Sequence, residues 1–184
     1  MVPPVLTCLI GRNLGTGIGS LDHFDLRDLA ASLLHHLCNK YSKYSHNLKP
    51  RLARSCLKTF LDPKKPFGSQ YGAILGLRAI GGAEVVRQLI LPNLKAYEEL
   101  LKDELQENSL KKAEADKVVA AILDALGTLV DDDLPMLNGH SEDAAADVRT
   151  KLIEKVGEVI GNKIADSGHT QLAKAVLDSD LPAI

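Results

Sequence analysis

Apolar residues recur every three or four positions along most of the chain, which is the spacing of amphipathic helices. The clearest case lies between residues 22 and 40, where one stripe contains Leu26, Leu29, Ala30, Leu33, Leu34, Leu37 and Cys38. Asp22 and Asp25 stand where carboxylates stabilise a helix N-terminus. We therefore predict a helix over residues 22–40 that buries this stripe.

The same periodicity predicts further helices, which proline and glycine separate. We expect them at residues 2–12, 47–61, 68–80, 83–105, 110–130, 141–165 and around 172–177. Pro63 and Pro66 interrupt the chain between two of these helices, and Gly81-Gly82 ends the helix over 68–80. Pro92 predicts a kink or a break within 83–105.

These elements predict an all-α fold, because no segment has the two-residue alternation of a strand. Two helix centres, near residues 31 and 74, are about 43 residues apart, within the range of HEAT and armadillo repeats. We expect an α-solenoid of antiparallel HEAT-like helix pairs, seven to eight helices long, with residues 1–184 as a single domain. A compact helical bundle is the alternative.

Composition narrows the class of protein. Aromatic residues make up only 4% of the 184 residues and Trp is absent, which favours helices over sheets. The three cysteines, Cys8, Cys38 and Cys56, have no paired spacing and are expected to be reduced and mostly buried. No membrane span or signal peptide is recognisable. A membrane protein, a disulfide scaffold and a zinc finger are therefore disfavoured.

Charge is distributed unevenly along the chain. Residues 1–102 contain 14 Lys/Arg and 7 Asp/Glu, whereas residues 103–184 contain 8 and 17. The basic excess is concentrated between residues 40 and 65, which suggests docking guided by charge. A solvated surface, an acidic protein partner and contact with phosphate all remain open for this cluster. The candidate partner-binding residues are Lys49, Arg51, Arg54, Lys58, Lys64, Lys65 and Tyr71.

No motif predicts catalysis, a cofactor or a metal. Gly15–Gly19 lacks the pattern of a nucleotide-binding loop, and Asp131–Asp133 lacks the pattern of a calcium loop, so both are expected to be plain loops or turns. Four histidines lie near Cys38 without the spacing of a zinc site, namely His23, His35, His36 and His46. We predict that the protein is not an enzyme and binds no small-molecule substrate.

Several short motifs together resemble a known family. They are the opening Val2–Cys8, the run Leu26–Ala30, and Tyr71-Gly72-Ala73 followed by Gly76-Leu77 and by Leu91-Pro92-Asn93-Leu94. Over residues 1–95 the chain resembles the C-terminal HEAT-repeat domain of TBP-associated factor six, a subunit of the transcription factor TFIID.

The resemblance implies a nuclear scaffold in TFIID, or in a SAGA-type coactivator, that holds other TBP-associated factors during transcription initiation by RNA polymerase II. The alternative is a helical repeat module that contacts nucleic acid through the basic cluster. Gly72 and Gly76 are four residues apart, so they share one helix face. Because glycine inside a helix costs about 1 kcal/mol relative to alanine, we expect close helix packing to compensate, with the approach of a partner as the alternative.

Overall fold

A computed structural model of the chain describes residues 2–12, 14, 23–105, 109–130 and 142–179. Its α-helices are α1 (Val2–Ile10), α2 (His23–Tyr41), α3 (Leu48–Phe60), α4 (Phe67–Val85), α5 (Leu94–Leu105), α6 (Ser109–Gly127), α7 (Glu142–Val156), α8 (Glu158–Asp166) and α9 (Thr170–Asp178). No strand occurs in these residues. The segments Gly15–Gly19 and Asp131–Asp133, expected to be loops or turns, lie outside them.

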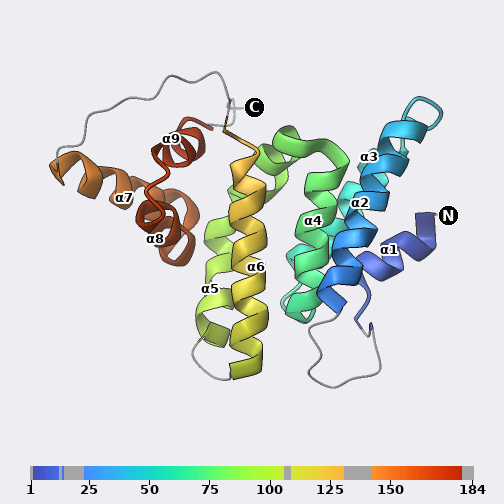
Figure 1. The fold of residues 1–184 in the computed structure, drawn as a ribbon, viewed down its shortest axis with the longest axis horizontal. Helices are drawn as coiled ribbons and strands as arrows, with labels where there is room; N and C mark the ends of the chain where they lie inside the picture. The colour runs from blue at the N-terminus through green and yellow to red at the C-terminus, as the bar shows by residue number, and fades with distance from the viewer. Residues whose placement is uncertain (1, 13, 15–22, 106–108, 131–141, 180–184) are drawn as a thin grey trace.

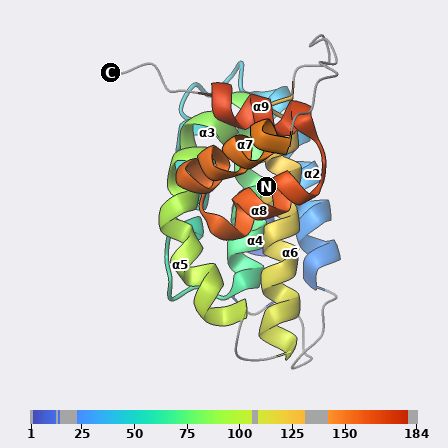
Figure 2. The ribbon, with the colours of Figure 1, turned by 90° about the vertical axis from the view of Figure 1, so that its left-hand side faces the viewer.

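Helices α2–α6 run up and down side by side, with α1 at one end of the row (Figure 1). Helices α7, α8 and α9 form the other end, where they lie in front of the rest of the row in the end-on view (Figure 2). The predicted all-α solenoid is confirmed. None of the helices in the described ranges combines the length and the apolar character of a membrane span.

Helix α4 lies at the centre of the first half of the row, where it packs against α1, α2, α3 and α6. Its residues Ala73, Ile74, Leu77 and Ile80 are all buried. They belong to one cluster of buried apolar side chains that extends along the chain from Val5 to Val176. Burial of this cluster is the main favourable contribution to folding.

The connection from α4 to α5 breaks where glycine and proline predict it. Gly82 adopts a φ of 55°, which an L side chain rarely adopts, and interrupts the helical backbone inside α4. A π-helical segment, Val86–Ile90, and a 3₁₀ turn, Leu91–Asn93, then lead into α5. Pro92 lies in this turn, where its missing N–H is tolerated.

Helix α2 departs from the prediction that it buries a single apolar stripe. Ala30, Leu34, Leu37 and Cys38 are buried, but three leucines face solvent, with exposed fractions of 40% for Leu26, 68% for Leu29 and 46% for Leu33. Arg27, which lies between Leu26 and Leu29 in the sequence, points inward instead and is 1% exposed. The helix is therefore rotated so that a guanidinium group, rather than these leucines, faces α1 and α4.

The helix predicted over 141–165 is divided in two. Gly157 has a φ of 93°, which separates α7 from α8. The backbone N–H of Val159, in the first turn of α8, donates to Glu98 Oε1 on α5 at 2.8 Å. A carboxylate from another helix thus caps α8, and this long-range contact has no counterpart in the local sequence pattern.

Candidate protein-interaction surface

The outward face of α3 carries the largest part of the predicted basic cluster. Leu52, Cys56 and Phe60 point into the core at four-residue steps. This orientation exposes Arg51, Arg54 and Lys58 and leaves Lys49 half-buried. Residues 29–61 contain six Lys/Arg and no Asp/Glu. Within the described part of the chain, none of the four cations on α3 is in an ion pair, so the face keeps its positive charge.

Lys64 and Lys65 lie apart from this face, in the loop between α3 and α4. They line a pocket of about 440 Å³ together with two cations that sequence reasoning missed, Arg12 and Lys111. Arg12 Nη2 donates to the carbonyl oxygen of Lys64 at 2.9 Å. No pattern in the sequence could reveal these two residues, because the fold brings them to the loop from distant parts of the chain.

Tyr71 belongs to a third surface, a groove of about 640 Å³ between α2, α4 and α6. Its hydroxyl donates to Asp28 Oδ1 at 2.7 Å, and its ring packs edge-on against Phe24. Burial and the hydrogen bond to Asp28 raise the pKa of Tyr71. Arg78 and Asp124 form an ion pair in the same groove. The predicted partner-binding residues are therefore distributed over three surfaces.

The glycines of α4 lie where two other helices come closest to it. A Cβ atom on Gly72 would lie 2.8 Å from the carbonyl carbon of Leu9 on α1, and closer still to its oxygen. One on Gly76 would lie 2.7 Å from a methyl group of Leu9 and 2.8 Å from Cys56 Sγ on α3. At Gly72 the neighbouring atoms belong to the backbone of Leu9, so no side chain fits there and α1 rests directly on α4. At Gly76 the neighbours are side-chain atoms, which would have to shift.

Arg27 anchors the same contact from α2. Its Nη1 donates to the carbonyl oxygen of Leu9 at 2.5 Å, and its Nη2 donates to that of Gly11 at 2.9 Å. Burial lowers the pKa of Arg27 to about 10, and the nearby Glu114 opposes this shift, so the guanidinium remains charged at neutral pH. The carbonyl of Leu9 lies in the last turn of α1 and that of Gly11 just after it, where the helix offers no partner, and Gly11 also accepts from Ser69 Oγ at 3.0 Å. Arg27 therefore supplies the C-terminal cap of α1.

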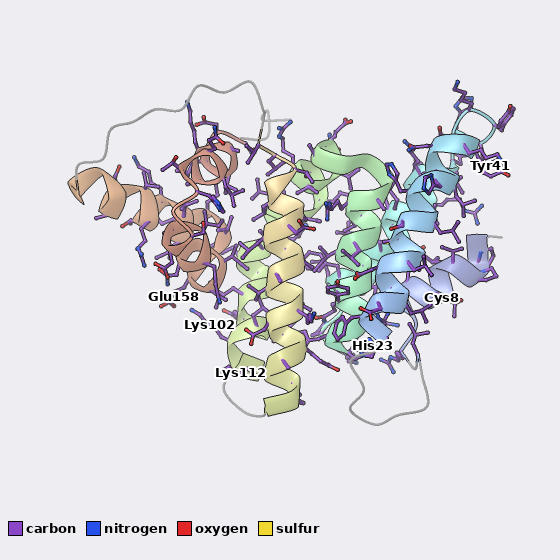
Figure 3. The ribbon with its side chains drawn as sticks, viewed as in Figure 1. Cys8, His23, Tyr41, Lys102, Lys112 and Glu158 are labelled. Carbon is purple, nitrogen blue, oxygen red and sulfur yellow. The ribbon has the colours of Figure 1, made fainter. Side chains whose placement is uncertain are left out.

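His23, His35 and Cys56 have structural surroundings. His35 Nδ1 lies 3.0 Å from the carbonyl oxygen of Ala79, and His23, at the lower end of α2 in Figure 3, lies 3.9 Å from Glu114. No metal-binding group of His, Cys, Asp and Glu occurs among the residues that the structure describes. Burial raises the pKa of Cys56 to about 12, which keeps this thiol protonated and unreactive.

Comparison with known proteins identifies the family. The model of the TAF6 C-terminal HEAT repeat domain matches residues 1–95, just over half of the chain. This chain belongs to that family. The match has the bounds expected from the motifs, and it includes α1–α4, the glycine contacts and Arg27.

Relatives from distant eukaryotes extend the similarity. The chain is 38% identical to the SAGA complex/transcription factor TFIID complex subunit Taf6 of Schizosaccharomyces pombe over 180 residues, which is 97% of this chain and 38% of that protein. It is 42% identical to transcription initiation factor TFIID subunit 6 of Arabidopsis thaliana over 134 residues, 71% of this chain and 24% of that protein. The chain thus spans well under half the length of these relatives.

Proposed function

We propose that this protein is a non-enzymatic scaffold in a transcription initiation complex of the TFIID or SAGA type. In this role it binds other TBP-associated factors in the nucleus. The observation that carries the proposal is the similarity over nearly the whole chain to the fission-yeast subunit of both complexes. Solenoids present long surfaces to partners, which suits this role.

We further propose that residues 1–184 act as one domain whose partner-binding surface includes the basic face of α3. The continuous cluster of buried side chains from Val5 to Val176 supports a single domain. The exposed Arg51, Arg54 and Lys58 support docking, because a surface without compensating carboxylates attracts an acidic partner and excludes a basic one. Lys49 is half-buried and lies about half a turn away, on the side of Leu52 and Cys56, so we do not include it in this surface.

The proposal is tested by affinity purification of the tagged chain from nuclear extract of its source cells, with nuclease added and bound proteins identified by mass spectrometry. We expect subunits of TFIID or SAGA to be recovered in spite of nuclease. The triple variant R51E/R54E/K58E should lose most of this recovery while its circular dichroism and melting temperature stay close to those of the original chain.

A matched variant, K117E/K163E/K174E, makes the same change in net charge on exposed residues of α6, α8 and α9. It should retain the partners. Equal loss from both variants would remove α3 from the proposal, because the effect would then follow net charge alone. If proteins are recovered only when nuclease is omitted, the scaffold role is overturned in favour of nucleic-acid contact.

A further inference from the structure

The pocket that contains Lys64 and Lys65 is built from four parts of the chain. Arg12 follows α1, the loop residues lie between α3 and α4, Leu100 comes from α5, and Lys111 and Glu114 come from the beginning of α6. This is the end of the molecule at which α4 and α6 begin, the lower end in Figure 1. The pocket therefore depends on the assembled fold rather than on any single helix.

The pocket is strongly positive. Arg12, Lys64, Lys65 and Lys111 line it, and Glu114 is its one acidic lining residue. Burial raises the pKa of Glu114, and the charges of Arg27 and Lys111 oppose this shift. Its Oε1 lies 3.9 Å from His23 Nε2. Neither Lys64 nor Lys65 is in an ion pair with any residue that the structure describes. An anionic ligand would therefore meet uncompensated positive charge.

The two lysines are held by a rigid turn. Pro63 and Pro66 flank them and fix two backbone φ angles. The N–H of Lys64 donates to Asp62 Oδ1 at 3.0 Å, and the N–H of Lys65 donates to the carbonyl oxygen of Asp62 at 3.1 Å. Little conformational entropy is lost when a ligand binds to cations whose backbone is ordered beforehand.

The pocket also has four apolar lining residues, Phe67, Leu100, Pro63 and Pro66, which we call its apolar floor. Phe67 also begins α4, and Pro66 gives that helix no side-chain cap, so the positive end of its dipole faces the same region. A volume of about 440 Å³ accommodates a few side chains. A DNA duplex is too broad to enter a pocket of this size, because its major groove alone is about 12 Å wide.

We propose that this pocket binds a short acidic segment of a partner protein, with an apolar side chain on Phe67 and Leu100 and flanking carboxylates toward Arg12, Lys64 and Lys65. The inference rests on the proposed role as an interaction domain and assigns it a second docking site, separate from the face of α3. The apolar floor favours a peptide over a bare phosphate group, because it gives an anion alone no contact.

The test uses the purified 184-residue chain and a fluorescein-labelled peptide in which a Phe-Leu pair is flanked on both sides by Asp and Glu. Fluorescence anisotropy measures its Kd. We expect K64E/K65E to weaken binding by at least about tenfold, since close charge pairs in an apolar setting contribute strongly to affinity. The matched variant K163E/K174E, with the same change in net charge on α8 and α9, should change the Kd by less than about twofold.

Two altered probes test the chemistry of the ligand. Replacing the carboxylates of the peptide by amides should abolish binding, and replacing the Phe-Leu pair by Gly-Ser should weaken it by about tenfold. The proposal is overturned if K64E/K65E and K163E/K174E bind the peptide equally, or if the Gly-Ser peptide binds as well as the original. Tight binding of a DNA duplex that K64E/K65E abolishes would assign the pocket to nucleic acid instead.

Failure of this proposal can be distinguished from failure of the proposed function. Peptide binding is measured on the isolated chain and does not depend on which complex contains it. If the peptide binds as expected but no TFIID or SAGA subunit is recovered from extract, the proposed peptide site is supported and the proposed role in these complexes is wrong. If the subunits are recovered by R12E/K64E/K65E as well as by the original chain, and the peptide does not bind, only the pocket is wrong.

Discussion

The two ends of the solenoid are held together differently. Between α1, α2 and α4 the contacts are buried, and they combine glycine backbone with hydrogen bonds from Arg27, whose side chain is almost completely shielded from solvent. Between α5, α7 and α8 an apolar core is supplemented by exposed ion pairs such as Lys102–Glu158, whose partners lie close together in Figure 3. Close backbone packing tolerates no added atom, whereas an exposed ion pair can rearrange or be replaced by water.

The largest effect is expected from Gly72→Ala. The added methyl group would collide with the carbonyl of Leu9, so α1 would have to move away from α4. We expect a loss of at least about 3 kcal/mol in the free energy of unfolding, at the upper end of overpacking costs, in spite of the higher helix propensity of alanine. Urea denaturation followed by circular dichroism measures it.

Gly127→Ala is the matched control. Gly127 also lies in a helix, at the end of α6, but an added Cβ there meets nothing within 4 Å. It should leave stability unchanged or raise it by up to about 1 kcal/mol. Similar losses from the two substitutions would show that helix propensity or backbone freedom, and not the contact with Leu9, decides the outcome.

A somewhat smaller loss is expected from Arg27→Met, which keeps the length of the side chain but removes the donor to the carbonyl of Leu9 and one of the two donors to that of Gly11, which also accepts from Ser69 Oγ. We expect about 2–3 kcal/mol, since the buried carbonyl of Leu9 loses its partner while the cost of burying the charge disappears. The stability of Arg27→Lys should lie between that of the original chain and that of Arg27→Met, because one ammonium group cannot donate to both carbonyls as the guanidinium does. A lysine variant as unstable as the methionine variant would argue that shape, rather than hydrogen bonding, matters here.

This contrast explains what the sequence could predict. Helix positions followed from periodicity, and the family from motifs in residues 1–95, because both are local features. The rotation of α2 could not be predicted, since the pattern around Leu29 has no signal that Arg27 turns inward to cap another helix. For the same reason, only two of the four cations of the basic pocket could be predicted from the sequence. Lys64 and Lys65 are adjacent in sequence, whereas Arg12 and Lys111 reach them only through the fold.

At the second end of the solenoid, the largest loss of stability from one substitution is expected at Gly157. The backbone there has a φ of 93°, and an added Cβ would crowd Glu98. Gly157→Ala should cost about 2 kcal/mol, from backbone strain and from displacement of the carboxylate that caps α8. Gly168→Ala provides the comparison, because Gly168 also has a positive φ, 67°, but open space around it. Its cost should be about 1 kcal/mol, and thermal denaturation of both variants gives the difference. Equal costs would remove the contact with Glu98 from the explanation.

The smallest effect is expected at the exposed ion pair, and it should depend on pH. The hydrogen bond from Lys102 Nζ, at 2.7 Å, lowers the pKa of Glu158. Because the lowered pKa belongs to the folded state, the stabilisation is fully present above the ordinary pKa of glutamate and disappears as the pH falls through the lowered value. The original chain should therefore lose slightly more stability than Glu158→Gln between about pH 6 and about pH 3. Added salt should shrink the difference, since both side chains are exposed to solvent. Urea midpoints measured across this range test the sign, and a larger acid loss in the glutamine variant would contradict it. If the loss of stability that Glu158→Gln causes at neutral pH is instead as large as the loss that Arg27→Met causes, the exposed pair contributes as much as the buried anchor. The contrast between the two ends of the solenoid would then fail.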